Sequence, residues 1–411
     1  MYNEQYAKRR KCDICTGCGR CSNTTAASDV LSVMPLWESG RVRRELDEGE
    51  SDVGLVTADI GTTTIAMQLH NAKGDCIDRF VSLNPQAEFG ADVLSRIAAV
   101  NRDNNSAVKM RSLVLECLKK GLAQFETQIP REKIRQLVIA ANTTMTYLMM
   151  GWDPRELGEA PFHVSHMDET ETEIEGIRTY LFPALSAFVG GDITAGIMAC
   201  GMTRQKKITL LIDLGTNGEL VLGNCDRIIT ASTAAGPAFE GGVNRGVWGA
   251  DMVSILAELL RENVLDATGL LQGRFFEDGV HINGVHVTQQ SIRAIQLAKG
   301  AIMAGIRILT EQYGIPMEKI DRVVLAGGFG YYLKPEDAAC IGLIPQNLVQ
   351  RTITGGNTAL TGGLCFGLKK ETEDNGILFW KNPLLKIECV NLAEVDSFAD
   401  YYFSSMDLER F

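Results

Sequence analysis

The chain of 411 residues is 45% apolar, which suits about two to three domains of ordinary size and a substantial buried core. Its formal net charge of −11 argues against a nucleic-acid-binding surface, which needs basic patches. The sequence contains no uninterrupted run of about 18 apolar residues, the length needed to cross a membrane, and its amino terminus lacks the apolar core of a signal peptide. We therefore expect a cytoplasmic protein without a membrane partner.

Four cysteines near the amino terminus, in the stretch KCDICTGCGRCS, follow one another at a constant spacing. Thiols in a reducing compartment are more often metal ligands than disulfides, and thiolates on a tight loop can converge on one metal centre. The spacing favours an iron–sulfur cluster, with [4Fe–4S] as the first choice, and zinc or free thiols are the alternatives. The four candidate ligands are Cys12, Cys15, Cys18 and Cys21.

Residues 23–52 shift to a polar and acidic composition, which is typical of a linker. We therefore expect a Cys-rich loop over residues 1–22 that this linker joins to a folded remainder. A flexible linker would allow the loop to reach a partner protein.

Two segments a domain length apart share one pattern, in which an apolar strand ends in Asp and is followed by an apolar residue, Gly and Thr. They are VTADIGTTTIAMQL at Val56–Leu69 and LLIDLGTNGELVLG at Leu210–Gly223. Each predicts a β-hairpin whose turn exposes backbone N–H groups and hydroxyls, and such turns can bind phosphate oxygens. Ordinary hairpins are the alternative, but the repetition within one chain argues against it.

The aspartates that end the two strands, Asp59 and Asp213, would lie where a hydrated Mg2+ bridges to the same phosphates, because this cation prefers carboxylate and water oxygens. No GxxxxGK[ST] or GxGxxG motif occurs, so neither a P-loop nor a Rossmann site is expected. The candidate phosphate-binding residues are Gly61, Thr62, Thr63 and Thr64 in the first turn and Gly215, Thr216, Asn217 and Gly218 in the second.

Three glycine-rich segments follow the first hairpin. VGGDITAGIMACG places Asp192 at the head of a small-residue helix, and GGNTALTGGLCFG is a second segment of this kind. Close helix packing explains both, and Asp192 is also a catalytic candidate. RVVLAGGFG is an apolar strand running into Gly327 and Gly328, where a flat ring could lie against the backbone.

The remaining signals indicate structure. Residues 106–122 have helical spacing and predict a core-facing helix. The acidic run Asp168–Glu175 is interpreted as a solvated loop or edge, with a docking surface as the alternative. His163 and His166 have no partners that would complete a metal site, and the seven isolated cysteines are expected to be buried structural thiols.

The glycine-rich motifs, in their order along the chain, resemble those of the acetate and sugar kinase, heat-shock chaperone and actin superfamily, over roughly residues 53–370. Within it, the chain is most similar to the reductive activators of corrinoid proteins. The motifs that carry this likeness are ADIGTTTIA, GADVLSRI, AANTTM, VGGDITAG, LIDLGTNGE, TAAGPAFEGG and LAGGFG.

The resemblance implies an α/β, duplicated actin-like fold of the ribonuclease H type, with two domains around a nucleotide cleft. It implies ATPase subdomains over residues 53–205 and 206–370 and a C-terminal tail, residues 371–411, that packs on the ATPase core. Members of the family are ATPases that return an inactivated cobalt(II) corrinoid to cobalt(I). The implied partners are therefore a corrinoid protein of a methyltransferase system and a low-potential electron donor such as ferredoxin or flavodoxin, and a homodimer is implied as well.

Carried over by motif, the resemblance places the β- and γ-phosphates of ATP between the turns at Asp59 and Asp213, and Asp192 near the attacking water or the magnesium shell. Well-known members carry a whole [2Fe–2S] domain or tandem ferredoxin repeats, whereas here only the compact cysteine run is present, which leaves the cluster type open. The implied adenosine pocket consists of Gly327, Gly328 and Phe329, walled by Gly236, Phe239 and Glu240.

Other functions stay open on the sequence. A small-metabolite kinase of the same superfamily would use the same ATP site, although it does not need the cysteine run. An activator of a 2-hydroxyacyl-CoA dehydratase is also a redox ATPase, but that group holds its cluster through cysteines within the ATPase core. A binding module that uses nucleotide only as a clamp is the non-enzymatic alternative.

Overall fold

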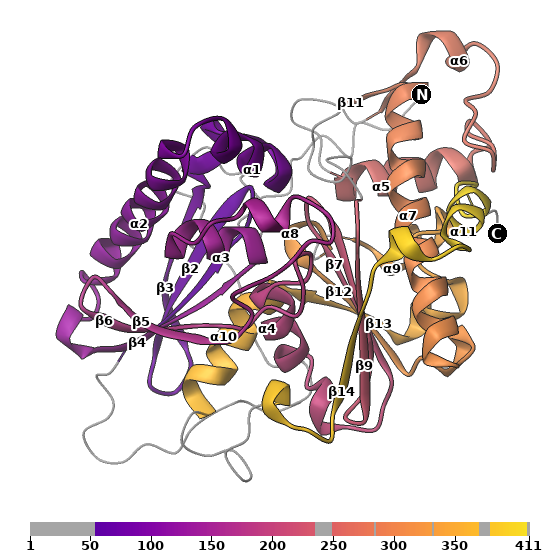
Figure 1. The fold of residues 1–411 in the computed structure, drawn as a ribbon. Coiled ribbons are helices and arrows are strands. Elements are labelled where there is room, and N and C mark those ends of the chain that lie inside the picture. Colours follow the sequence, from indigo (N-terminus) through magenta and orange to yellow (C-terminus); the bar gives the residue numbers. More distant parts are fainter. Residues whose placement is uncertain (1–53, 235–248, 283–284, 331–332, 370–378, 409–411) are drawn as a thin grey trace.

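The computed structural model describes residues 54–234, 249–282, 285–330, 333–369 and 379–408. They form two six-stranded sheets with helices on their outer sides and two helices between them (Figure 1). The cysteine run and the linker lie outside the described residues. In the described part of the chain, no helix has the length and apolar character needed to span a membrane.

The first sheet has the order β3-β2-β1-β4-β6-β5. Its first three strands form an antiparallel meander, in which β1 and β2 are the hairpin that the sequence predicts, and β4 runs parallel to β1. The acidic run forms the edge strand β5, as interpreted from its composition. The strands are β1 (Gly54–Ile60), β2 (Thr64–Asn71), β3 (Cys76–Leu83), β4 (Ile134–Ala141), β5 (Thr170–Ile174) and β6 (Ile177–Leu181).

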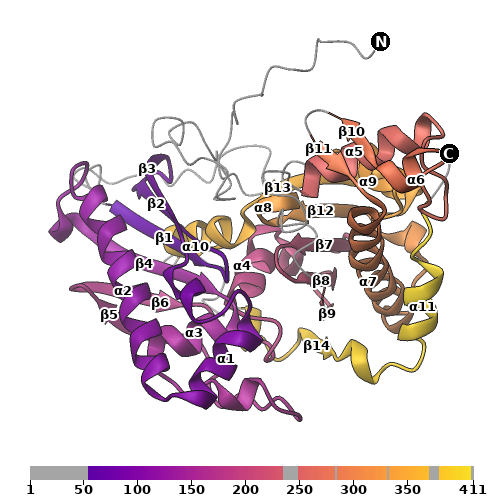
Figure 2. The ribbon, with the colours of Figure 1, turned by 90° about the horizontal axis from the view of Figure 1, so that it is seen from above.

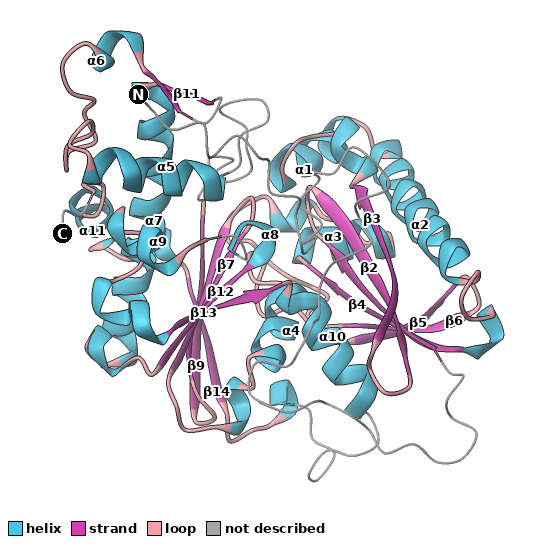
Figure 3. Cartoon of the chain, turned by 180° about the vertical axis from the view of Figure 1, so that it is seen from behind, coloured by secondary structure: helices cyan, strands magenta, loops and turns pink. Residues whose placement is uncertain are grey.

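The second sheet repeats this plan with the order β13-β12-β7-β8-β9-β14. Again three consecutive strands form an antiparallel meander, and β12 runs parallel to the first of them (Figure 3). The expected duplicated α/β fold is therefore confirmed. The strands are β7 (Thr209–Leu214), β8 (Gly218–Gly223), β9 (Arg227–Thr233), β12 (Arg322–Ala326), β13 (Thr352–Gly356) and β14 (Lys386–Val390), with a separate hairpin of β10 (Val280–Ile282) and β11 (Val285–Val287).

Helices α1, α2 and α3 cover the outer side of the first sheet, and α5, α7 and α9 lie on the outer side of the second (Figure 1). The expected core-facing helix is α2, which buries Met110, Val114 and Leu118. The helices are α1 (Val93–Arg102), α2 (Asn105–Phe125), α3 (Thr143–Met150), α4 (Gly191–Ala199), α5 (Gly249–Arg261), α6 (Phe275–Asp278), α7 (Gln289–Tyr313), α8 (Gly327–Gly330), α9 (Pro335–Cys340), α10 (Thr358–Lys369) and α11 (Phe398–Ser404).

The two small-residue helices, α4 and α10, lie side by side between the sheets (Figure 2). A Cβ atom on Gly362 of α10 would be 2.0 Å from the carbonyl oxygen of Ala195 in α4. Close packing of these helices, as the sequence predicts, therefore depends on glycine at this position. Helix α4 follows strand β6 of the first sheet, and α10 follows β13 of the second. Their contact therefore brings the carboxyl ends of these two strands toward each other.

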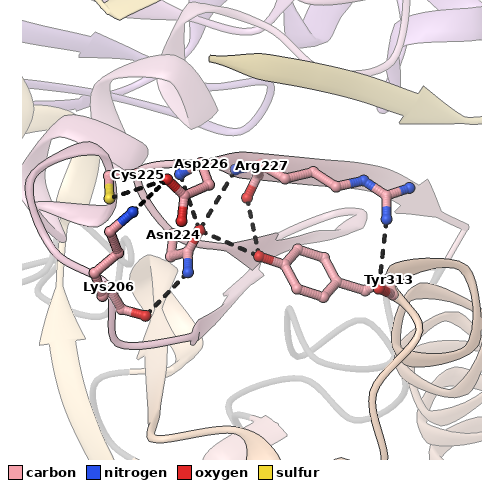
Figure 4. A network of polar contacts seen from close by, with 6 residues as sticks. All are labelled: Lys206, Asn224, Cys225, Asp226, Arg227 and Tyr313. Atoms are coloured by element: carbon pink, nitrogen blue, oxygen red, sulfur yellow. Dashed lines mark hydrogen bonds and ion pairs between the residues drawn. The ribbon is translucent and has the colours of Figure 1, made fainter. Parts of the chain in front are cut away.

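The turn between β8 and β9 is tied to the neighbouring elements by polar contacts (Figure 4). The Asn224 side chain accepts from the backbone N–H of Asp226 at 2.9 Å and from the hydroxyl of Tyr313, at the end of α7, at 3.3 Å. It donates to the carbonyl oxygen of Lys206 at 2.9 Å, and Lys206 forms an ion pair with Asp226. This network fixes the end of the second sheet opposite to the predicted phosphate turn.

The C-terminal segment packs on α7. Helix α11 lies so close to α7 that a Cβ on Gly300 would be 3.2 Å from the carbonyl oxygen of Tyr402. The buried Lys299 donates to the carbonyl oxygen of Asp407. The expectation that the seven isolated cysteines are buried is wrong for three of them, since Cys389 is exposed on the edge strand β14 and Cys76 and Cys225 are only partly buried.

Candidate nucleotide site

The turns of the two repeat copies face each other. The hydroxyl oxygens of Thr63 and Thr216 are 3.5 Å apart, although they come from different sheets. Each turn is closed by a backbone hydrogen bond, from Gly61 N to the carbonyl oxygen of Thr64 at 2.9 Å, and from Gly215 N to that of Asn217 at 3.0 Å. The structure thus brings together the two sets of residues that the sequence predicts to bind phosphate.

Asn142, from the motif AANTTM, links the first turn to α3. Its side-chain oxygen caps α3 by accepting from the backbone N–H of Met145 at 2.9 Å, and its amide donates to the hydroxyl of Thr62 at 3.0 Å. A Cβ on Gly190 would be 2.5 Å from the backbone of Asn142. Since Gly190 directly precedes α4, the first turn and the head of α4 are adjacent.

Three aspartates that the sequence singles out share this region. Burial raises the pKa of Asp59 to about 7, with the charge of Asp192 adding and a hydrogen bond from Asn357 opposing. Burial likewise raises the pKa of Asp192 to about 6, against the hydrogen bond from the backbone N–H of Ile193. The pKa of Asp213 rises to about 8 through burial and the charges of Asp192 and Asp59. The charge of Asp192 thus contributes to the raised pKa of both other aspartates.

Glu219 is a fourth carboxylate of this group, and the sequence reasoning missed it. It lies opposite Asp213 in the β7–β8 register, and cross-strand partners project from the same face of a sheet. Its pKa is raised well above the ordinary value by burial and then by the charges of Asp192 and Asp213. The register of the predicted hairpin was the signal that could have identified this residue.

The head of α10 contacts one aspartate from each sheet. The side-chain amide of Asn357 donates to Oδ2 of Asp59 at 2.6 Å, while its oxygen caps the helix through the backbone N–H of Leu360. The hydroxyl of Thr358 donates to Oδ2 of Asp213 at 3.4 Å. This segment looked like packing alone in the sequence, so neither residue was predicted to belong to the site.

The first glycine of LAGGFG, Gly327, lies against the second turn. Gly327 has φ of +85°, and a Cβ there would be 2.4 Å from the carbonyl oxygen of Leu214 and 2.6 Å from Oδ1 of Asp213. Gly328 and Phe329 follow in the backbone of α8. The other residues of the implied adenosine pocket, Gly236, Phe239 and Glu240, lie outside the described residues, as do the four candidate cluster cysteines.

The site is rich in oxygen ligands and negative charge. Among the described residues, no group of three or more His, Cys, Asp or Glu side chains is close enough to hold a metal ion unaided. Partly buried carboxylates with raised pKa values fit a hard cation that completes its shell with water and phosphate oxygens. His163 and His166 take no part in this group, and the ring of His166 stacks on Trp152 at a centroid distance of 4.1 Å.

Comparisons with known proteins agree with this architecture. The family model of the RACo middle region matches residues 54–205, and that of the C-terminal domain of RACo, the ASKHA domain, matches residues 207–246 and 242–410. The paired sheets with their facing turns thus define a protein with an ASKHA domain, the domain of the acetate and sugar kinase, heat-shock chaperone and actin superfamily. The chain belongs to the RACo family of reductive activators of corrinoid proteins.

Two relatives and one solved structure are similar over most of the chain. The corrinoid activation enzyme RamQ of Eubacterium limosum is 32% identical, over 79% of this chain and 66% of its own length. The [Co(II) methylated amine-specific corrinoid protein] reductase of Methanosarcina barkeri is 22% identical, over 72% and 66%. The structure of a reductive activator for corrinoid,iron-sulfur protein superposes with a TM-score of 0.75 and 28% identity, over 88% of this chain and 67% of that one. The chain thus spans 66% of the length of either relative.

Proposed function

We propose that this protein is an ATP-dependent reductive activator, which returns the cobalt(II) corrinoid of a partner protein to cobalt(I). The names of both relatives support an action on corrinoid proteins. The observation that carries the ATPase part is that the two repeat turns meet, at Thr63 and Thr216, among four partly buried carboxylates.

In the nucleotide step, the amides and hydroxyls of the two turns bind the β- and γ-phosphates of ATP. Asp59 and Asp213 would hold a hydrated Mg2+ ion, which would supply positive charge to neutralise that of the transferred group. Asp192 orients the attacking water. The adenosine lies near Gly327, where the absence of a side chain lets the backbone lie against the second phosphate turn.

In the electron step, one electron passes from a reduced low-potential donor to cobalt(II), which becomes cobalt(I), and the donor is oxidised by one electron. The four cysteines Cys12, Cys15, Cys18 and Cys21 would hold an iron–sulfur cluster, and such a cluster would supply one-electron transfer. Reduction to cobalt(I) is uphill from ordinary donors, and each 59 mV corresponds to about a factor of ten in equilibrium for one electron. Hydrolysis of ATP to ADP and phosphate supplies this free energy by changing the conformation that faces the partner.

The direct test is anaerobic reduction of a purified cobalt(II) corrinoid protein, followed by its absorption spectrum. We expect the cobalt(I) spectrum to require this protein, a reductant and ATP together. Asp192→Asn should bind nucleotide but support neither hydrolysis nor reduction. Equal reduction with and without ATP would contradict the proposal, and phosphorylation of a metabolite would favour the kinase alternative.

We further propose a cytoplasmic homodimer that accepts electrons from ferredoxin or flavodoxin. Light scattering coupled to size exclusion measures the mass of the purified protein against the 44.9 kDa of one chain. Substituting ferredoxin or flavodoxin for the chemical reductant in the reduction assay tests the donor. A mass equal to that of one chain would reject the homodimer. Failure of reduction with both ferredoxin and flavodoxin would reject the proposed donors.

A further inference from the structure

A buried cation lies directly behind the first phosphate turn. The side chain of Arg96, on α1, has no exposed surface. Its guanidinium donates to the carbonyl oxygen of Thr62 at 2.6 Å, to that of Gly90 at 3.1 Å and to Oε1 of Gln86 at 3.2 Å, and it contacts Sδ of Met145 at 3.1 Å. One arginine thus joins the turn to α1, to the loop before α1 and to α3.

Among the residues that the structure describes, Arg96 has only neutral groups in direct contact with its charge. Burial lowers the pKa of Arg96 to about 10, and the charge of Asp92 opposes this shift. Asp92 is exposed and caps α1 by accepting from the backbone N–H of Ser95 at 2.8 Å. Among the described carboxylates, none forms an ion pair with Arg96. A buried charge is costly without a compensating one, so the site favours an anion close to this guanidinium.

The contacts behind the turn also orient its peptides. The carbonyl oxygen of Gly61 accepts from the side chain of Asn84 at 2.8 Å, that of Thr62 from Arg96, and that of Thr63 from the backbone N–H of Asn84 at 2.8 Å. In a planar trans peptide, the next N–H points away from the carbonyl oxygen. The N–H of Thr63, which follows the Thr62 carbonyl, is therefore directed away from Arg96, and the N–H groups of Thr62 and Thr64 are directed away from Asn84.

We propose that Arg96 is a positioning residue for the phosphate chain of the nucleotide. It holds the Thr62–Thr63 peptide with its N–H toward the phosphates, and the phosphate charge balances its own across that peptide. The fixed fork of donors in a guanidinium suits this task, and a charge one peptide away acts strongly in a poorly solvated interior. This inference rests on the proposed nucleotide site and adds that Arg96 selects for the phosphate chain, not for the nucleoside.

The test compares the binding of ADP, pyrophosphate and adenosine to the full chain by calorimetry. We expect Arg96→Gln to weaken ADP and pyrophosphate about tenfold or more, the range for a lost charged hydrogen bond, and to leave adenosine within about twofold. Arg96→Lys keeps the charge and should recover part of the loss. In the ATPase assay, Arg96→Gln should raise KM for ATP more than it lowers kcat.

Arg322→Gln is the matched control. Arg322 is also largely buried and donates to the carbonyl oxygen of Cys200 and the hydroxyl of Thr209, at the end of β12 remote from the site. It should lower the unfolding temperature without changing the affinity for ADP. Should Arg96→Gln not fold, Asn84→Asp replaces the test, because it places a negative charge behind the same turn and should weaken ADP but not adenosine.

The results separate the two proposals. Equal losses for ADP and adenosine in Arg96→Gln, or no recovery in Arg96→Lys, would overturn the role of Arg96. Unchanged ADP affinity in Arg96→Gln would do the same while leaving the nucleotide site intact. A wild-type protein that binds neither ADP nor pyrophosphate would reject the nucleotide site itself, and the inference with it.

Discussion

Four acidic side chains of the site lie in an environment that disfavours their charged forms, namely Asp59, Asp192, Asp213 and Glu219. Burial raises the pKa of each, and neighbouring charges add to the shift for all but Asp192. With pKa values of about 7 and about 8, Asp59 and Asp213 retain protons at neutral pH that these side chains would lose in water. Binding of a cation is the simplest way for these groups to ionise without repulsion.

The first prediction concerns pH and stability. The folded pKa values of Asp59 and Asp213, about 7 and about 8, exceed the ordinary 3.8 of the unfolded chain. Their stabilising contribution is therefore complete below pH 3.8 and is lost as the pH rises through the folded values. We expect Asp213→Asn to unfold at a higher temperature than wild type at pH 8.5 in chelator, with a smaller difference at pH 6. The same difference at both pH values would contradict this assignment.

The second prediction concerns Asn357, whose hydrogen bond lowers the pKa of Asp59. In Asn357→Ala the pKa of Asp59 should rise further, so that more of it is protonated at neutral pH. We expect a higher KM for Mg·ATP, with a larger defect at pH 6.5 than at pH 8.5, in the ATPase pH profile. Asn391→Ala, which removes an amide cap remote from the site, should match wild type. Parallel profiles for Asn357→Ala and wild type would disprove the link to Asp59.

At this scale the sequence predicted what lies within one motif and missed what depends on tertiary contact. The strand-ending aspartates and turn threonines could be identified because a hairpin is local. Asn357 and Arg96 reach the site from segments remote in the chain, and nothing in their own neighbourhood indicates an aspartate or a carbonyl partner. Glu219 is intermediate, since the hairpin register alone places it opposite Asp213.

Among the elements, the pair of α4 and α10 positions the site. Asp192 lies at the head of α4, and Asn357 and Thr358 lie at the head of α10. The packing of the two helices leaves no space for a side chain at Gly362. The sequence predicted close packing because small residues recur in both segments. It could not predict that α10 contacts aspartates of both sheets, because this depends on how the two halves are assembled.

The third prediction tests this packing. A Cβ on Gly362 would overlap the backbone of Ala195, whereas one on Gly363 would be 3.3 Å from the side chain of Thr57. We expect Gly362→Ala to lower the free energy of unfolding by about 1–3 kcal/mol and to reduce ATPase activity. Gly363→Ala, its matched control, should lose less of both. Urea unfolding of the two variants measures the difference, and similar losses would show that the close approach is not decisive.

For the whole molecule, the duplication was predictable because each half carries the same local motif. The order of strands within each sheet was not predicted from the residues, since pairing of β1 with β4 joins segments far apart in the sequence. The assignment of the cysteine run also stays a prediction, because those residues lie outside the described part.

The fourth prediction addresses this run in the whole protein. Changing Cys12, Cys15, Cys18 and Cys21 to Ser should remove iron and acid-labile sulfide from anaerobically purified protein and abolish corrinoid reduction. ATP hydrolysis should persist, because the described site contains none of these residues. Metal analysis and electron paramagnetic resonance of the reduced protein provide the measurement. Zinc in place of iron, or unchanged reduction by the variant, would remove the proposed electron port.

The head of α10 also couples the two halves of the molecule. Asn357 bonds to Asp59 of the first sheet at 2.6 Å, and Thr358 bonds to Asp213 of the second at 3.4 Å. Helices α4 and α10 share one buried cluster with side chains of both sheets, among them Val138 and Leu211. A movement that separated the two sheets would therefore break at least one of these bonds and divide the phosphate site between the two parts.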